Sequence, residues 1–189
     1  MDVLAGTDFF TVEVLTRRGL VTYYVLFFLH LETRRVTLAG VTRHPTEQWM
    51  TQIARNAIDH ESGYSKQHRY LLHDGDTKFC AEFRDTLATA GVKCLRLPPR
   101  SPNLNAFAER WVRSVKSECL SKLILFGESS LRRALTNFCE HYHAERNHQG
   151  KGNQLLFARS DLGKPFSRGT VRCDERLGGL LKYYRREAA

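Results

Sequence analysis

The chain has 189 residues, of which 42% are hydrophobic and 26% are charged. This composition is typical of a soluble globular domain and excludes a wholly disordered chain, and the length suits one domain with its own core. The 29 Lys and Arg residues outnumber the 20 Asp and Glu residues, which gives a net charge of +9. A basic surface attracts polyanions, so nucleic acid is the first partner to consider, although a solvated basic face has the same composition.

Two other classes of protein are disfavoured. The five cysteines are widely spaced and odd in number, so a zinc-binding knuckle is not expected, and reduced thiols in a cytoplasm fit best. The most apolar run, Val21–Leu31, is about half as long as the roughly 20 residues that a membrane helix needs. Because this run is rich in Val, Tyr and Phe, it predicts a buried strand and no membrane partner.

The first part of the chain is rich in β-forming residues. Thr7–Leu15, Leu20–Leu31 and Arg34–Val41 read as strands with short connections, which predicts an antiparallel meander. The apolar spacing then becomes helical over Pro45–His60, and Pro45 fits a helix start.

Strands and helices alternate after that point. We expect a short strand at Arg69–His73, a helix at Phe79–Ala90 that Gly91 ends, and a strand at Val92–Leu97. Two longer helices are predicted at about 106–123 and 129–145. The order predicts an α/β domain with a mixed five-stranded sheet, antiparallel in its first three strands and flanked by helices.

The C-terminal part differs in character. Residues 147–165 are polar and contain glycine, which predicts a loop, and the basic end RLGGLLKYYRREAA is expected to form a short helix. We therefore expect a core at residues 1–146, followed at 147–189 by a loop and basic tail that form no separate domain.

Three acidic residues stand where this architecture would converge. Asp8 lies in the first strand, Asp74 ends the fourth, and Glu109 lies in the first turn of the helix after the fifth. Strand ends and helix starts can point into one crevice. Three carboxylates without a neighbouring His or Cys ligand suit Mg²⁺ or Mn²⁺, and a pair of such ions supports phosphoryl transfer. For a lone Asp, a cap or a solvated surface group is the commoner explanation.

Four segments resemble the catalytic core of DDE-type integrases, the family of retroviral integrases and bacterial insertion-sequence transposases. These segments are TDFF, HDGDTKF, PPRSPNLNAFAERWVRSVKSECL and HYHAERNHQG, and together they span nearly the whole chain. The third, the glutamate helix, is the most specific. The resemblance implies an RNase H-like fold, with Asp8, Asp74 and Glu109 as the metal-binding catalytic triad and two Mg²⁺ or Mn²⁺ ions as cofactors.

The second acidic position has a rival. Asp74 precedes Phe79 by the family's interval, which favours it, and Asp76 then stands where the family usually has glycine. Positions 75 to 108 leave 34 residues between Asp74 and Glu109, one fewer than is typical of the family.

Cations follow the third acid. Arg113 and Lys116 lie four and seven residues after Glu109, so all three share a helix face, and cations there could hold DNA phosphates. The resemblance implies a DNA contact for Lys116. Arg110 and Arg100 are further candidates, and the alternative for each cation is a solvated charge.

The resemblance implies metal-dependent DNA strand cleavage and strand transfer in transposition or integration. A catalytically inactive, transposase-derived DNA-binding protein and an RNase H-like nuclease acting on RNA–DNA hybrids are the alternatives. We expect DNA and further copies of the chain as partners, and a cytoplasmic, nucleoid-associated location in a bacterium. Asp8 lies close to Met1, so a helix-turn-helix that reads DNA ends is expected on a separate subunit or on an N-terminal domain outside this sequence.

Overall fold

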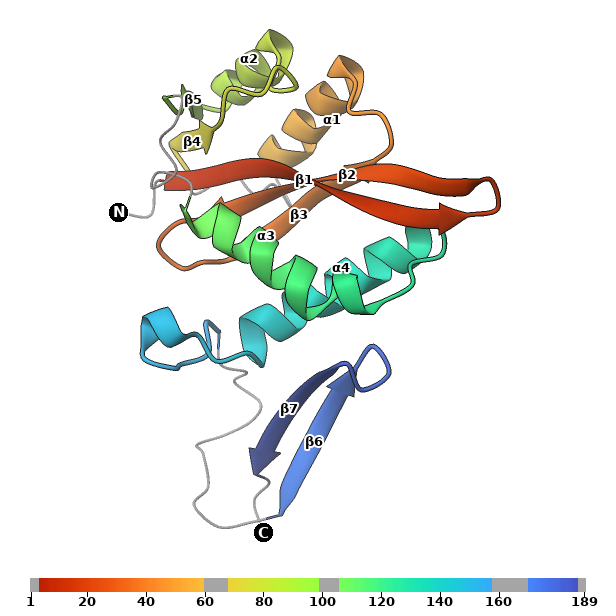
Figure 1. Ribbon diagram of the computed structural model, residues 1–189. Coiled ribbons are helices and arrows are strands. Elements are labelled where there is room, and N and C mark those ends of the chain that lie inside the picture. Colours follow the sequence, from red (N-terminus) through yellow and green to blue (C-terminus); the bar gives the residue numbers. More distant parts are fainter. Residues whose placement is uncertain (1–3, 60–67, 99–105, 158–169, 187–189) are drawn as a thin grey trace.

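The computed structural model describes residues 4–59, 68–98, 106–157 and 170–186. Its centre is a five-stranded sheet with the strand order β3-β2-β1-β4-β5 (Figure 1). The strands are β1 (Leu4–Thr16), β2 (Gly19–His30), β3 (Val36–Thr42), β4 (Tyr70–His73) and β5 (Lys93–Arg96). The pairs β1–β2 and β2–β3 are antiparallel, whereas β4 runs parallel to β1 and β5 parallel to β4. The predicted mixed sheet, with its antiparallel first three strands, is therefore confirmed.

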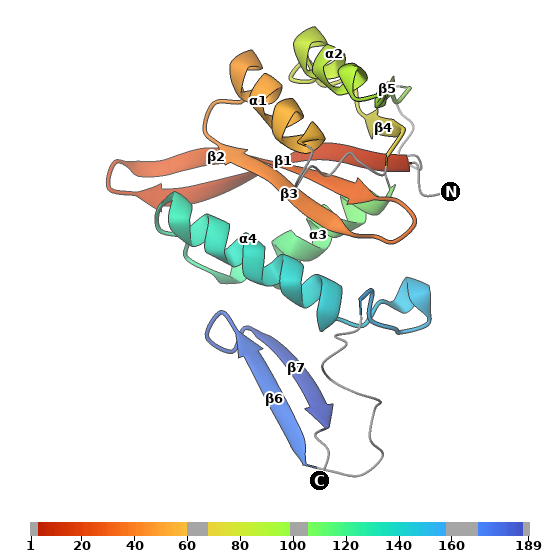
Figure 2. The same ribbon diagram turned by 180° about the vertical axis from the view of Figure 1, so that it is seen from behind.

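Helices cover both faces of the sheet (Figures 1 and 2). On one face lie α1 (Glu47–Ile58) and α2 (Ala81–Thr89), and on the other lie α3 (Ala106–Glu118) and α4 (Gly127–Ala144). Each pair of helices closes its own apolar core against the sheet. The chain is thus a three-layer α/β arrangement in which two cores share one central sheet.

The alternation of side chains along β1 divides them between these two cores. Phe10, Val12 and Val14 belong to the core under α3 and α4, while Ala5 and Phe9 pack with the core under α1 and α2. The strand β1 is therefore covered on both sides, and the face that a β1 residue occupies decides which helices it meets.

The strand β2 carries the most apolar run of the chain, and its residues from Val25 to His30 are all buried. The prediction of a buried strand at Val21–Leu31 is confirmed. Within the described ranges, we find no helix with the length and apolar character needed to cross a membrane.

The helices begin and end close to the predicted places, with one exception. The hydroxyl of Thr46 accepts a hydrogen bond from the Trp49 backbone N–H at 3.3 Å and so caps the start of α1. The helix α3 ends at Glu118, earlier than expected, and a 3₁₀ turn, η3 (Leu120–Lys122), follows it. A second 3₁₀ turn, η4 (Gln149–Lys151), lies in the segment that was expected to be a loop.

The prediction of a short C-terminal helix is wrong. Residues 171–186 form an antiparallel hairpin of β6 (Val171–Arg176) and β7 (Leu181–Arg186), which lies beside α4 (Figure 2). Leu177, Gly178 and Gly179 connect the strands with φ angles of 52°, 69° and 85°. Positive φ favours a tight turn and ends a helix, so the Gly-Gly pair is the signal for a hairpin.

Candidate active site

Asp8 lies in the middle of β1, on the side of the sheet that faces α3. Phe10, two residues along the strand, points to the same face as Asp8 and packs edge-on against Trp111 of α3, with ring centroids 5.6 Å apart. Asp8 is half-buried, and its Oδ1 accepts a hydrogen bond from the Phe9 backbone N–H at 2.7 Å. The first candidate carboxylate is therefore fixed on a rigid central strand.

Asp74 directly follows β4, the strand that pairs with β1. The parallel pairing of β1 with β4 ends at Gly6 and Leu72, and the same offset, if continued for two residues, would place Asp74 opposite Asp8. Partners in a parallel ladder point to the same face of the sheet. Asp76 lies two residues beyond this register, so the ladder favours Asp74 as the neighbour of Asp8.

The loop around Asp74 is held from two sides. The buried His73 has Nδ1 2.6 Å from the Asp74 carbonyl oxygen, and because a carbonyl oxygen only accepts, Nδ1 must carry the proton. Burial lowers the pKa of His73, so this ring is neutral at pH 7. A Cβ on Gly75 would lie 2.9 Å from Nη2 of Arg96, so the Arg96 guanidinium lies against this loop. Sequence reasoning missed Arg96, although its position at the end of β5 signals proximity to the end of β4.

The Asp76 carboxylate accepts hydrogen bonds from Lys78 in the same loop. Its Oδ1 accepts from the Lys78 backbone N–H at 2.9 Å, and its Oδ2 accepts from Lys78 Nζ at 2.7 Å. Burial raises the pKa of the Asp76 carboxyl, but these hydrogen bonds from Lys78 outweigh it, and the net pKa is lowered. Asp74 Oδ1 in turn accepts a hydrogen bond from the Asp76 backbone N–H at 3.0 Å, so both carboxylates help to hold this loop, and Asp76 is the one that carries the ion pair with Lys78.

Glu109 is exposed and lies in the first turn of α3. The buried stripe of this helix, Ala108, Trp111 and Val115, packs on the sheet, and Trp111 lies 4.4 Å from Phe27, ring centroid to ring centroid. Phe27 is the register partner of Asp8 on β2. The packing of one aromatic pair therefore sets the start of α3 above the middle of β1.

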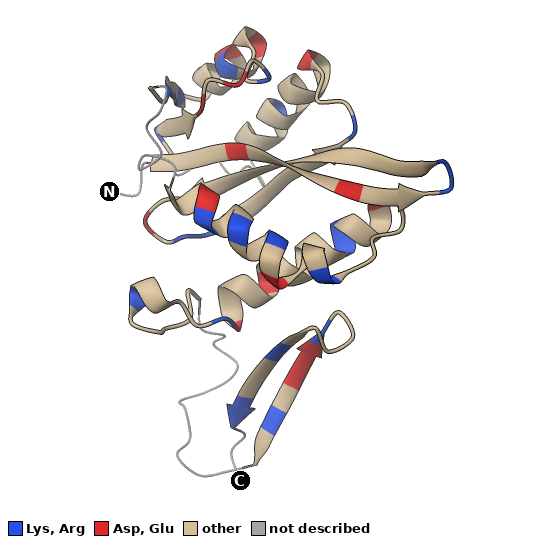
Figure 3. Cartoon of the chain, in the orientation of Figure 1, with Lys and Arg blue, Asp and Glu red and all other residues tan. Residues whose placement is uncertain are grey.

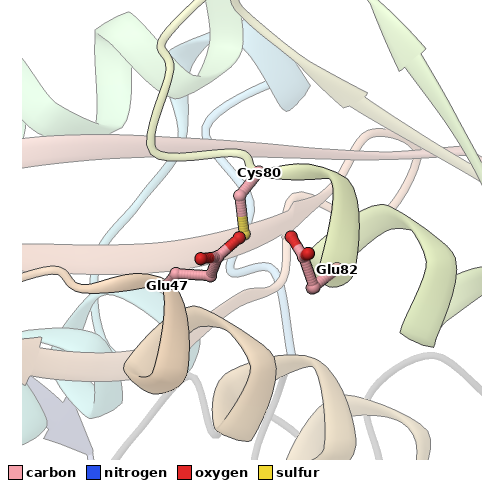
Figure 4. Close-up of side chains that lie close together, drawn as sticks. All are labelled: Glu47, Cys80 and Glu82. Carbon is pink, nitrogen blue, oxygen red and sulfur yellow. The ribbon is translucent and has the colours of Figure 1, made fainter.

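The three candidate acids come from β1, the residue after β4 and the start of α3. Their ligand atoms do not all lie within 4.8 Å of one another. Among the described residues, the group that satisfies this distance is Glu47, Cys80 and Glu82, at the starts of α1 and α2 (Figure 4).

The Glu47–Cys80–Glu82 group is explained by the packing of α1 against α2. A hydrogen bond with Glu82 raises the pKa of Glu47, and the same hydrogen bond lowers the pKa of Glu82. Both carboxylates are exposed, and carboxylates are favourable in the first turn of a helix. No sequence signal pointed to this group, and it lies on the opposite face of the sheet from α3.

The predicted cations divide between two sides of α3. Figure 3 shows basic bands along this helix after an acidic band near its start. Arg113 and Lys116 are exposed, and Lys116 Nζ lies 5.8 Å from the centroid of the Phe10 ring, two residues along β1 from Asp8. Arg110 is also exposed but reaches toward Phe107, 5.8 Å from its ring centroid, and lines a separate cavity. Arg100 lies outside the described residues.

Residues 90–154 match the family model of the integrase core domain. No curated protein sequence gives a match.

Solved retroviral integrases share the fold. The chain is similar to the HTLV-2 integrase catalytic core domain in complex with magnesium, in its trimeric form, with a TM-score of 0.59 and 12% identity over 81% of this chain and 93% of that one. It is similar to a chain of the simian T-cell lymphotropic virus intasome in complex with PP2A regulatory subunit B56 gamma, with a TM-score of 0.60 and 12% identity over 96% and 66% of the two chains. For the BIV integrase catalytic core the TM-score is 0.53, with 14% identity over 79% and 89%.

The matched segment runs from the end of α2 through β5, α3 and α4 to just beyond η4, and it includes Glu109 and Lys116. Asp8, on β1, and Asp74, directly after β4, lie outside the matched segment. Residues 90–154 therefore match the integrase core domain, and the chain has an RNase H-like fold similar to that of a retroviral integrase catalytic core.

Proposed function

We propose that this chain cleaves DNA strands and joins them by transesterification, as a transposase or integrase. The observation that carries the proposal is the match of residues 90–154 to the integrase core domain, on a chain with the fold of a retroviral integrase catalytic core. We further propose Asp8 on β1, Asp74 after the paired strand β4, and Glu109 at the start of α3 as the carboxylates of the active site. Each of the three residues is half-buried or exposed, so a DNA phosphate can approach them.

The donor set fits Mg²⁺ or Mn²⁺. Asp8, Asp74 and Glu109 supply only carboxylate oxygens, which are the ligands that these hard cations prefer. One HTLV-2 integrase core with this fold was solved in complex with magnesium. When two ions are bound, they supply the activation of an attacking oxygen and the stabilisation of a leaving oxygen.

The protein's own residues bind and orient the DNA. The three carboxylates come from a central strand, the residue after a strand and the first turn of a packed helix, and such regular elements position a site more precisely than long loops do. Lys116 and Arg113 project from the same helix as Glu109 and offer positive charge to phosphates beside the reacting one. Arg96, against Gly75, adds a cation beside Asp74.

Water is the nucleophile in cleavage, and a DNA 3′-hydroxyl is the nucleophile in strand transfer. In each step one P–O bond forms as another breaks, so no covalent protein–DNA bond is needed. Self-association forms part of the proposal, because the HTLV-2 core has been solved in a dimeric and a trimeric form.

The test is nicking and joining of a DNA duplex with Mg²⁺, with Mn²⁺ or with EDTA. Asp8→Asn and Asp74→Asn should each lower the rate by more than about 100-fold, since a metal ligand supports several kcal/mol of transition-state stabilisation. Glu13→Gln is the matched control, because Glu13 is an exposed carboxylate on the same strand and bonds to Thr22.

The same assay separates the alternatives. An RNase H-like nuclease would cut RNA–DNA hybrid in preference to DNA duplex. A non-catalytic binding protein would bind DNA and give no metal-dependent product, and either result would overturn the proposal.

A further inference from the structure

A cavity of about 610 Å³ is lined in part by α3, the helix that carries Glu109. It is bounded by the start of α3, the end of α4, the turn between β2 and β3, and η4. Its lining contains four cations, and none of the described lining residues is a carboxylate. The cations are Arg34, Arg110, Arg146 and Lys151. A concave surface with this charge concentrates anions.

Arg34 has an unfavourable backbone conformation and an unsatisfied hydrogen-bond donor in this cavity. It occupies the turn between β2 and β3 with a φ angle of 65°, which a non-glycine residue rarely adopts. Its guanidinium lies over the Phe107 ring, and its Nη1 is buried without a hydrogen-bond partner among the described residues. Burial lowers the pKa of Arg34, Tyr142 opposes this shift, and the nearby charge of Arg110 adds to it. An unsatisfied buried donor on a charged group is unfavourable unless a ligand accepts from it.

Arg110 approaches the same cavity from α3. Its guanidinium carbon lies 5.8 Å from the centroid of the Phe107 ring, and its Nη1 lies 3.7 Å from where a Cβ on Gly150 would stand. The side chain thus reaches from α3 to η4. One aromatic ring therefore holds two guanidinium groups, Arg34 and Arg110, that repel each other in the absence of an anion.

The other two cations are partly engaged. Arg146 forms a two-fold ion pair with Glu118, with N–O distances of 2.6 and 2.8 Å, so its charge is offset. Lys151 Nζ donates to the carbonyl oxygen of Glu32 at 3.1 Å, which leaves its charge uncompensated. Among the described residues, the cavity therefore presents three cations without a carboxylate partner, Arg34, Arg110 and Lys151.

We propose that this cavity binds a backbone phosphate of the DNA, away from the phosphate that reacts. Guanidinium groups donate paired hydrogen bonds to phosphate oxygens, and an oxygen of a bound phosphate would satisfy Nη1 of Arg34. Arg110 directly follows Glu109 in the first turn of α3, so one DNA strand can meet the acids and the cavity together. This step rests on the proposed function, because that function identifies the anion as DNA.

The first experiment measures DNA affinity against salt concentration in EDTA, where no cleavage occurs. Arg34→Gln and Arg110→Gln should each weaken binding about five- to tenfold for any sequence and lower the log–log salt slope by about 1. Arg133→Gln is the matched control, an exposed arginine on α4 that does not line the cavity, and it should leave the slope unchanged. Slopes of both cavity variants equal to that of Arg133→Gln would overturn the proposal.

The second experiment observes the site directly. The NMR signals of the Arg34 and Arg110 Nε–H groups should shift when inorganic pyrophosphate is added, and DNA should displace it. Signals that respond to neither anion, or to pyrophosphate but not to DNA, would overturn the proposal. Neither measurement needs catalysis, so a protein that fails to nick DNA but shows these shifts would contradict the proposed function alone.

Discussion

The buried ion pair between Glu145 and Arg176 should hold the C-terminal hairpin on α4. Glu145 closes α4 with a side chain only 2% exposed, and Arg176 ends β6. Arg176 Nε lies 3.0 and 2.9 Å from the two carboxylate oxygens, Nη2 lies 2.7 Å from Oε1, and His141 Nδ1 lies 3.1 Å from Oε2. Of the two side chains that bond to this buried carboxylate, removal of Arg176 therefore leaves His141.

The expected loss follows from this geometry. Breaking a buried ion pair by deleting one partner costs about 3–5 kcal/mol. The Arg176 side chain is 23% exposed, so water can replace part of the interaction that the substitution removes. We therefore expect Arg176→Met to lower the free energy of unfolding by about 2–4 kcal/mol. Glu145→Gln should cost less, about 1–2 kcal/mol, because Arg176 still pairs with Glu140.

Urea unfolding at pH 7 measures both values. Lys182→Met is the control, since Lys182 and Glu175 form a pair on the same hairpin with both side chains about half exposed, and such pairs contribute about 0–1 kcal/mol. If Arg176→Met loses no more than Lys182→Met, the hairpin is not anchored by this pair.

The same pair gives a pH dependence. Burial raises the pKa of Glu145, but the hydrogen bonds from Arg176 and His141 outweigh it, and the folded pKa lies below the unfolded one. The stabilisation is therefore present above the unfolded carboxyl pKa of about 4.3 and is lost as the pH falls through the folded pKa. In Arg176→Met, the acid-side loss of stability should become smaller.

Three shorter predictions concern the loop, the core and a thiol. Asp74→Asn should abolish nicking while Asp76→Asn keeps most of it, because Asp76 pairs with Lys78; the reverse result would exchange their roles. Gly40→Ala should lower the free energy of unfolding by about 1–3 kcal/mol, since its Cβ would lie 2.6 Å from Cζ2 of Trp49; unchanged urea unfolding would contradict this. Burial raises the pKa of Cys139 to about 12, so a thiol reagent at pH 8 should leave it unmodified until the protein unfolds, as peptide mass mapping can check.

The sheet could be predicted because its signals are local. The runs that become β1, β2 and β3 are rich in β-branched and aromatic residues, and short turns force antiparallel pairing. The early end of α3 could not be read in the same way. Cys119 is buried and apolar like a helical position, yet it leaves the helix at φ −127°, and the helical spacing contains no breaker there.

The C-terminal hairpin was missed for another reason. The basic end was read as helical although Gly178 and Gly179 stand at its centre, and the glycine pair should have outweighed the apolar residues around it. What fixes the hairpin is non-local, because Arg176 pairs with Glu145 on α4. The spacing of residues in the sequence does not predict such a pair.

The residues of the candidate site could also be predicted only in part from the sequence. Asp74 was preferred over Asp76 from the motif interval alone, and this choice stays a prediction, which the pairing of Asp76 with Lys78 makes testable by comparing Asn substitutions of the two residues. The anion cavity could not be foreseen, since it joins Arg34 and Arg110 from elements 76 positions apart in the chain.

The most direct test of the central claim is strand nicking and joining by Glu109→Gln beside the unchanged protein, with Mg²⁺ or Mn²⁺ and with EDTA. Glu13→Gln provides a second carboxylate change, at an exposed residue of β1 that accepts a hydrogen bond from Thr22. We predict metal-dependent product that Glu109→Gln loses by more than about 100-fold and Glu13→Gln retains. Equal metal-dependent activity in the Glu109→Gln and unchanged proteins would contradict the account.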